Sequence, residues 1–152
     1  MQIDDTEILV SGGVIAGLIA AAAFGSAGHS VTCVDPAPPV TEEGAQGSDL
    51  RSTAFLHPSI AVLQAAGLWD RLAPHATALQ VMRIIDAGGK LSQARLTRDF
   101  DASEISDQPF GWNLPNWLLK REISARLASL QNVRFLPGTG TAGLVARDSE
   151  AL

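Results

Sequence analysis

The chain has 152 residues, of which 46% are hydrophobic and 18% are charged, and its formal net charge is −5. This length allows one domain with its own hydrophobic core, and the composition excludes a chain that is disordered over most of its length. The 11 Lys and Arg residues form no basic stripe, so the sequence predicts no nucleic acid partner.

The N-terminus carries Asp4 and Asp5 in place of the positive charge and long apolar stretch of a secretion signal, so we expect a cytoplasmic protein. The most apolar run, residues 14–24, is too short and too rich in Gly and Ala to span a bilayer. A peripheral membrane association or a multi-enzyme association remains open.

The first part of the chain predicts a β-α-β unit. Continuous apolar residues followed by glycines predict a buried strand over 7–10, and small apolar residues with good helix formers predict a buried helix over 14–27. Gly28 is placed where a left-handed helix stop is expected. A β-branched run predicts a second strand over 30–34 that leads directly into Asp35. The lone cysteine of this strand is interpreted as a buried, inert thiol.

The middle of the chain starts with a loop. Pro, Gly, Glu and small polar residues over 36–48 predict a mobile segment without regular structure. Order returns after Arg51, where Pro58 suits the first turn of a helix that ends near Gly67.

A hairpin is predicted next. The run 78–86 reads as a strand, residues 87–90 as a turn, and residues 91–96 as a second strand. The following stretch, 97–108, is acidic and weakly patterned.

The last part predicts a helix that begins after Pro115, then a strand over 132–136 and a possible strand over 142–147. The helix is predicted from an apolar stripe formed by Leu119, Ile123, Leu127 and Leu130.

The most informative motif is the glycine-rich stretch between the first strand and the first helix. In such a turn, backbone N–H groups and the positive end of the helix can hold a diphosphate. In a G-x-G-x-x-G frame, Gly12 and Gly17 take the first and third places, and Val14 takes the second. Asp35, at the end of the second strand, can accept hydrogen bonds from the adenosine ribose.

Val14 departs from the pattern, because the middle glycine normally lets the backbone approach the pyrophosphate. A branched side chain there is expected to collide with the ligand or to push the turn outward. A shifted frame would use Gly13 as the residue of close approach, but it would leave Ala16 in the third place. We prefer the first frame.

With these residues the chain resembles the FAD-dependent hydroxylases of ubiquinone biosynthesis, which are relatives of para-hydroxybenzoate hydroxylase. The resemblance covers most of the chain and rests on residues 8–35, 49–56 (DLRSTAFL), 66–69 (AGLW) and 110–116 (FGWNLPN). It implies an α/β, Rossmann-like FAD-binding fold of the glutathione-reductase type, with part of an inserted β-rich substrate region. The implied division is 1–76 for FAD binding, 77–111 for the start of the substrate region, and 112–152 for the return to the FAD-binding domain.

The resemblance also implies the cofactors and the site. FAD would be held by Gly12, Gly13, Val14, Ala16, Gly17, Asp35, Arg51 and Arg121. NAD(P)H would be the reductant, and the reaction would be the hydroxylation of a ubiquinone-precursor-like ring, an aromatic small molecule, with O2. FAD itself carries the difficult chemistry, so no catalytic side chain is assigned. The three histidines share no metal-ligand spacing, and we expect no metal site.

Members of this family carry a later Asp-Gly element and a later Gly-Asp element that contact the cofactor, and neither occurs before Leu152. We therefore expect a chain that lacks the C-terminal portion of the same fold and is inactive alone. One alternative is a non-catalytic nucleotide-binding or structural fragment with impaired FAD binding. A second alternative is a nicotinamide-only dehydrogenase, against which the long loop before Arg51 speaks.

Overall fold

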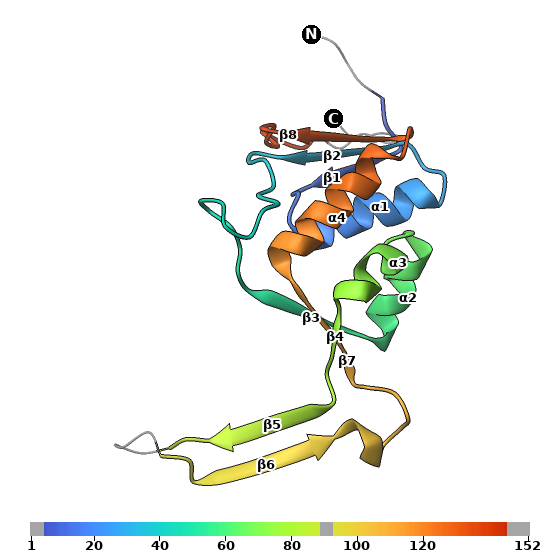
Figure 1. The fold of residues 1–152 in the computed structure, drawn as a ribbon. Coiled ribbons are helices and arrows are strands. Elements are labelled where there is room, and N and C mark those ends of the chain that lie inside the picture. The colour runs from blue at the N-terminus through green and yellow to red at the C-terminus, as the bar shows by residue number, and fades with distance from the viewer. Residues whose placement is uncertain (1–4, 89–92, 146–152) are drawn as a thin grey trace.

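The computed structural model describes residues 5–88 and 93–145, and Figure 1 shows their arrangement. The described strands form one parallel sheet and two antiparallel sheets. In chain order the elements are β1 (Ile8–Ser11), α1 (Ile15–Ser26), β2 (Val31–Asp35), β3 (Ser52–Leu56), α2 (His57–Ala65), α3 (Trp69–Leu72), the short 3-10 helix η1 (Ala73–His75), β4 (Thr77–Ala78), β5 (Val81–Asp86), β6 (Leu96–Asp101), the 3-10 helix η2 (Ala102–Glu104), β7 (Gly111–Pro115), α4 (Asn116–Ala128) and β8 (Val133–Pro137).

The parallel sheet has the strand order β1-β2-β8. Ile8 pairs with Val31, and Val31 pairs in turn with Val133. Helix α1 supplies the crossover that two neighbouring parallel strands require. The predicted β-α-β unit is confirmed, and Gly28, with φ of +98°, takes the left-handed conformation expected just after the helix.

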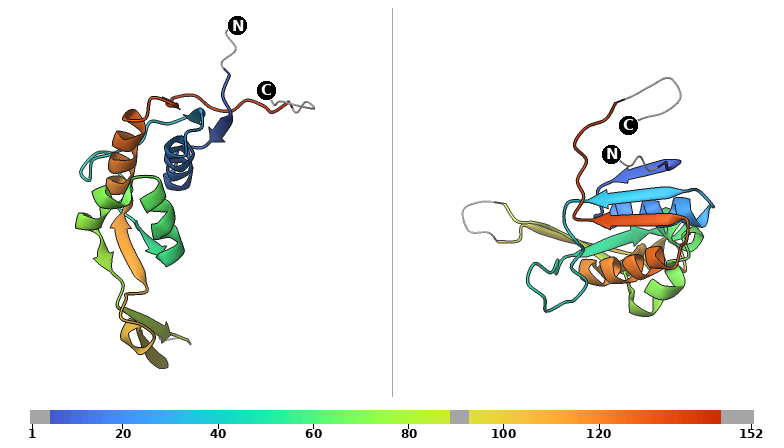
Figure 2. Two further views of the ribbon diagram at one scale, coloured as in Figure 1. Left: turned by 90° about the vertical axis from the view of Figure 1, so that its right-hand side faces the viewer. Right: turned by 90° about the horizontal axis from the view of Figure 1, so that it is seen from above.

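Helices α1 and α4 lie side by side on one face of this sheet (Figures 1 and 2). The buried face of α1 combines Leu18 with the small residues Ala21, Ala22 and Gly25, and a Cβ on Gly25 would collide with the side chain of Val133. The glycine therefore lets α1 approach β8 closely at this point. The apolar core extends from these helices to α2 and β7, and its largest fully buried side chains are Leu18, Leu63, Leu68, Leu72, Leu114, Leu119, Ile123, Val31 and Cys33.

Cys33 is fully buried on β2, as predicted from its apolar strand. Burial raises the pKa of the Cys33 thiol, and the nearby charge of Asp35 raises it further. The thiol is therefore protonated at neutral pH, which makes it a poor nucleophile. Within the described residues, no helix is long and apolar enough to cross a bilayer.

A second sheet, with the order β3-β7-β4, was not expected from the sequence. Its central strand β7 pairs antiparallel with β3, where Ser52 lies opposite Pro115, and also with β4. The five-residue strands β3 and β7 carry no clear alternation of apolar and polar residues, and each is completed by a partner far away in the sequence. Helix α2 follows β3 directly and has Pro58 in its first turn, as predicted.

The third sheet is the hairpin of β5 and β6, which extends away from the rest of the molecule (Figures 1 and 2). The predicted second strand, 91–96, was wrong: β6 begins at Leu96, and the stretch 97–108 contains most of β6 and all of η2. β6 contains charged residues in place of a regular apolar alternation, and Arg83, opposite Asp99 in the register, donates two hydrogen bonds of 2.7 Å to it. Residues 89–92 of the predicted turn and strand lie outside the described residues.

Two predictions near the C-terminus also need correction. Helix α4 ends at Ala128, so Leu130 lies beyond the helix on which its stripe was predicted. The possible strand over 142–147 is not formed at residues 142–145, and the remaining two positions lie outside the described residues.

The strand predicted over 78–86 is interrupted after Ala78 and resumes at Val81 as β5.

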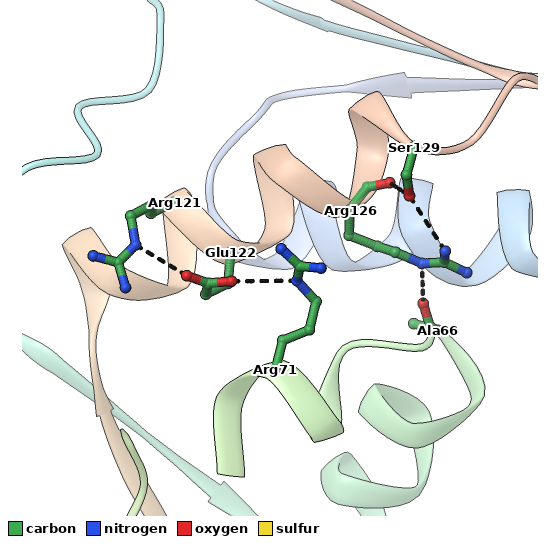
Figure 3. Close-up of polar contacts among 6 residues, drawn as sticks. All are labelled: Ala66, Arg71, Arg121, Glu122, Arg126 and Ser129. Atoms are coloured by element: carbon green, nitrogen blue, oxygen red, sulfur yellow. Dashed lines mark hydrogen bonds and ion pairs between the residues drawn. The ribbon is translucent and has the colours of Figure 1, made fainter. Parts of the chain in front are cut away.

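Arg126 on α4 joins three helices, and Figure 3 shows its contacts with Ala66 and Ser129. Its guanidinium donates hydrogen bonds to the carbonyl oxygen of Ala66 at 3.1 Å, to Oγ of Ser26 at 3.0 Å and to Oγ of Ser129 at 3.3 Å. Ala66 is the C-cap of α2 and Ser26 ends α1, so one side chain fixes the ends of two helices against α4.

We expect Arg126→Ala to lower the free energy of unfolding by about 2 kcal/mol, because three hydrogen bonds from a charged group are lost together. Urea denaturation followed by circular dichroism measures this change. Arg98→Ala is the control, since that guanidinium lies over the ring of Phe100 on the exposed hairpin. Equal effects of the two substitutions would contradict the role assigned to Arg126.

Candidate functional site

The candidate site lies at the carboxyl end of the parallel sheet. The carboxyl ends of β1, β2 and β8 meet there because the strands run in the same direction. Helix α1 begins at this end, directly after the turn that follows β1. In open α/β sheets, ligands bind in the crevice outside these strand ends. The glycine-rich turn is therefore in the position from which it could contact a nucleotide.

Gly12 makes the sharp turn out of β1. Its φ of +112° lies in a region that L-residues with a side chain rarely adopt, and its N–H donates to the carbonyl oxygen of Val34 at 2.8 Å. Gly17, in the first turn of α1, packs against this same residue, because a Cβ at position 17 would collide with the carbonyl oxygen of Gly12. The pair thus has the geometry of the first and third glycines in the preferred frame.

Gly13 is buried between the turn and the next strand. A Cβ there would lie 2.8 Å from Cβ of Asp35 and 3.0 Å from the ring of Phe135. The Gly13 N–H donates a 2.6 Å hydrogen bond to Oδ2 of Asp35. The structure therefore brings the glycine turn and the predicted acid into direct contact.

The Asp35 carboxylate is oriented by two backbone donors. Its Oδ2 accepts from Gly13, and its Oδ1 accepts from the N–H of Ala37 at 2.8 Å. Each carboxylate oxygen can accept more than one hydrogen bond. The side chain is therefore held at the crevice and retains acceptor capacity for the hydroxyl groups of a ligand.

Val14 is the N-cap of α1, in extended conformation, and 64% of the residue is exposed. No side chain caps this helix, and no acidic residue lies in its first turn. Ala16 is also exposed in that turn. The uncapped N–H groups and the lack of an acidic residue in the first turn of the helix fit a phosphate ligand. The residues therefore fit the diphosphate of FAD, with the Val14 side chain standing at the mouth of the turn.

Arg51 directly precedes β3 and lies beside the start of α4. Ser52 pairs with Pro115, and the Asn116 N–H donates to the carbonyl oxygen of Arg51 at 2.9 Å. Its guanidinium forms a two-pronged ion pair with Asp49, with distances of 2.8 and 2.9 Å. The Arg51 side chain is 83% exposed, and it pairs with Asp49 rather than with the turn.

Asn116 is a polar residue of this region to which the sequence analysis gave no role. It is 6% exposed, it donates to Oδ2 of Asp49 at 2.9 Å, and it accepts from the hydroxyl of Thr53 at 2.7 Å. Hydrogen bonds from Arg51 and Asn116 hold the pKa of the Asp49 carboxyl well below its usual range. The network fixes the end of the long loop against α4. The sequence signal that could have identified Asn116 is a polar residue directly after Pro115, at the start of an apolar helix.

Arg121 lies on α4 and is not brought into contact with the turn. Its Nε donates to Glu122 at 3.0 Å, and its guanidinium lies over the ring of Trp117, 5.3 Å from the centroid. Glu122 also accepts from Arg71 at 3.2 Å, so two arginines share one carboxylate (Figure 3). Among the described residues, no cluster of His, Cys, Asp and Glu has the composition of a metal site.

Several solved structures share this fold. The p-nitrophenol 4-monooxygenase PnpA from Pseudomonas putida DLL-E4 superposes with a TM-score of 0.70 at 22% identity, over 97% of this chain and 35% of that one. PqsL, a probable FAD-dependent monooxygenase from Pseudomonas aeruginosa, gives a TM-score of 0.70 at 20% identity, over 96% and 36%. The flavin-dependent monooxygenase PieE, solved in complex with FAD and substrate, gives a TM-score of 0.70 at 18% identity, over 96% and 26%.

The chain thus spans about a third of the length of the first two proteins, and the mixed α/β fold is shared over nearly all of this chain. No curated protein matches the sequence significantly. The sequence profile of the FAD binding domain matches residues 5–146, which include the glycine turn, Asp35 and both arginines. Since this match covers almost the whole chain and its turn has the geometry just described, the protein belongs to the FAD binding domain family.

Proposed function

We propose that this chain is the FAD-binding portion of a flavin-dependent aromatic monooxygenase. The observation that carries the proposal is the hydrogen bond from the Gly13 N–H to Asp35 at the uncapped start of α1. It joins the diphosphate-binding turn to the acid that would hold the ribose, in a chain that belongs to an FAD binding family. The similar fold of FAD-dependent monooxygenases supports the reaction class.

In the proposed site, the backbone of the glycine turn holds the diphosphate of FAD, and Asp35 accepts hydrogen bonds from the adenosine ribose. The contributing turn residues are Gly12, Gly13, Val14, Ala16 and Gly17. Arg51 and Arg121 are proposed to approach the cofactor. Each would have to exchange part of its present ion pair with Asp49 or Glu122 for that contact.

When bound, FAD supplies the oxygen chemistry, and we propose NAD(P)H as its reductant. The residues of this chain bind and orient the cofactor. The proposed substrate is an aromatic small molecule related to a ubiquinone precursor, an assignment that rests on the motifs over 49–56 and 110–116. The proposed domain division assigns 1–76 and 112–152 to FAD binding and 77–111 to the start of the substrate region.

Turnover is proposed to require a C-terminal portion of the same fold, since the solved monooxygenases are about three times as long as this chain. The exposed position of Val14 favours one alternative, a nucleotide-binding fragment without catalysis. The two functions differ in the FAD affinity that they predict. The proposed function requires FAD binding, whereas the alternative predicts impaired binding, because the Val14 side chain at the mouth of the turn would hinder the diphosphate.

Titration of FAD into the wild-type chain and into Val14→Gly, followed by flavin fluorescence, tests the proposal. We expect the wild type to bind FAD and the glycine variant to bind about fivefold more tightly, because the backbone can then approach the diphosphate. Val81→Gly, an exposed valine on the hairpin, is the control and should leave the affinity unchanged. Absence of binding by both the wild type and Val14→Gly would contradict the proposed function. Equal affinities would contradict the steric role of Val14.

A further inference from the structure

The hairpin of β5 and β6 (residues 81–86 and 96–101), called the arm below, is not held by burial against the rest of the chain. Every residue of β5 is exposed, and so are the first four residues of β6. Figures 1 and 2 show the arm projecting from the region of β4 and β7. A two-stranded hairpin gains little stability by itself. The direction of the arm is therefore set where its two ends join the second sheet.

Backbone hydrogen bonds hold one side of this junction. β4 pairs with β7 in the second sheet, and the pairing continues past β4. The Leu79 N–H donates to the carbonyl oxygen of Gly111, and the Phe110 N–H donates to that of Leu79, both at 2.9 Å. We call residues 109–111, which lead back from the arm into β7, the return segment. These bonds fix the return segment along the edge that faces β4.

On the other side of the return segment, the backbone pairing stops. Leu56 and Gly111 are the last pair of β3 and β7. The chain then turns into α2 at His57, and the next residue, Pro58, has no N–H to donate. At this point the His57 side chain takes over, because its Nε2–H donates to the carbonyl oxygen of Pro109 at 2.8 Å. A side chain of α2 thus continues the contact where the backbone ladder ends.

Ring contacts orient the His57 imidazole toward the return segment. Its ring lies edge-on to that of Trp112, with centroids 5.4 Å apart, and Trp112 lies edge-on to Trp69 at the same separation. Both tryptophans pack against the apolar core. His57 itself is exposed, so water can replace the carbonyl oxygen of Pro109 as its partner. The hydrogen bond can therefore open while the core stays packed.

We propose that the hydrogen bond from His57 to Pro109 is a latch that fixes the direction of the arm, and that its opening lets the arm swing about its two connections to the second sheet. The inference does not depend on FAD binding. Under the proposed domain division, His57 belongs to the FAD-binding part and Pro109 to the start of the substrate region. The latch would then set the direction of one part relative to the other.

Distances between two spin labels, measured by pulsed electron paramagnetic resonance on the full chain, test the latch. The labels are attached at Thr97→Cys on β6 and at Ala125→Cys on α4, both exposed positions. The native Cys33 is buried and should not react. We expect a narrow distribution of distances in the chain with His57 and a broader one in His57→Ala, because the arm then takes several directions.

Two further variants show which atoms form the latch. His57→Gln retains an N–H donor and should keep the narrow distribution, whereas His57→Phe retains a ring without a donor and should behave as His57→Ala does. His75→Ala, an exposed histidine in η1, is the matched control and should leave the distribution narrow.

Amide hydrogen exchange gives a second readout, without labels. We expect His57→Ala to speed exchange of the Phe110 N–H by about fivefold, the effect of losing one neutral hydrogen bond beside it. The Gly12 N–H, which is bonded to Val34 in the parallel sheet, should exchange at its wild-type rate. This comparison distinguishes the latch from a general loss of stability.

Four results would overturn the proposal. The distribution could stay narrow in His57→Ala, or it could already be broad in the chain with His57. A narrow distribution in His57→Phe would show that ring packing alone directs the arm. Faster exchange at both Phe110 and Gly12 would show that His57 stabilises the whole fold and not the direction of the arm.

Discussion

Gly17→Ala is expected to destabilise the chain by about 3 kcal/mol and to abolish measurable FAD binding. Inside a helix, a change from glycine to alanine ordinarily stabilises by up to about 1 kcal/mol. Here the added Cβ would collide with the carbonyl oxygen of Gly12, which belongs to the backbone and cannot rotate away. Relief requires α1 to move from the turn, and that movement changes the spacing of the N–H groups. Urea denaturation and FAD titration measure the two effects.

Gly44→Ala is the matched control for this substitution. A Cβ at position 44 would meet no atom within 4 Å, and its φ is not positive. We expect its free energy of unfolding to stay within about 0.5 kcal/mol of the wild type, with FAD affinity unchanged. If Gly17→Ala were as stable as Gly44→Ala, the close contact between Gly12 and Gly17 would not be needed for folding.

Asp35→Asn is expected to weaken FAD binding by about thirtyfold, or ~2 kcal/mol, because hydrogen bonds to a charged acceptor are stronger than those to an amide. The amide oxygen can still accept from Gly13, so the turn should keep its path and the chain should remain folded, although the amide nitrogen cannot accept from Ala37. Titration with FAD and with ADP should give the same loss, since the ribose is common to both ligands.

Asp99→Asn is the control for the loss of one carboxylate charge outside the candidate site. Like Asp35, Asp99 accepts two hydrogen bonds, but its donors are the guanidinium nitrogens of Arg83. It lies on the hairpin, away from the parallel sheet. Its replacement should leave FAD affinity unchanged. An Asp35→Asn variant that binds FAD as tightly as Asp99→Asn does would remove Asp35 from the proposed site.

The parts of the fold that could be predicted are those encoded by neighbouring residues. The unit from β1 to β2 has apolar strands, a helix of small residues and a glycine stop, and each of these signals lies within one element. The contact between Gly13 and Asp35 follows from the same unit, because parallel pairing brings the end of β1 beside the end of β2.

The parts that could not be predicted depend on partners distant in the sequence. Strand β3 is completed by its pairing with β7, and β6 is paired along its whole length with β5, including the exposed pair of Arg83 and Asp99. Likewise, Asp49 gains its role only when Asn116 approaches it from α4. Local propensity carries no information about such pairings.

Positions 14 and 17 have opposite freedom to change during evolution. At position 17 a larger side chain would collide with the backbone of Gly12, so substitutions there are expected to be selected against whether or not a ligand is bound. At position 14 the side chain points into solvent from a cap that any residue in extended conformation can form. Under the proposed function, affinity can therefore be lost or regained at this position while the protein stays folded, so that selection can act on cofactor binding and on folding separately.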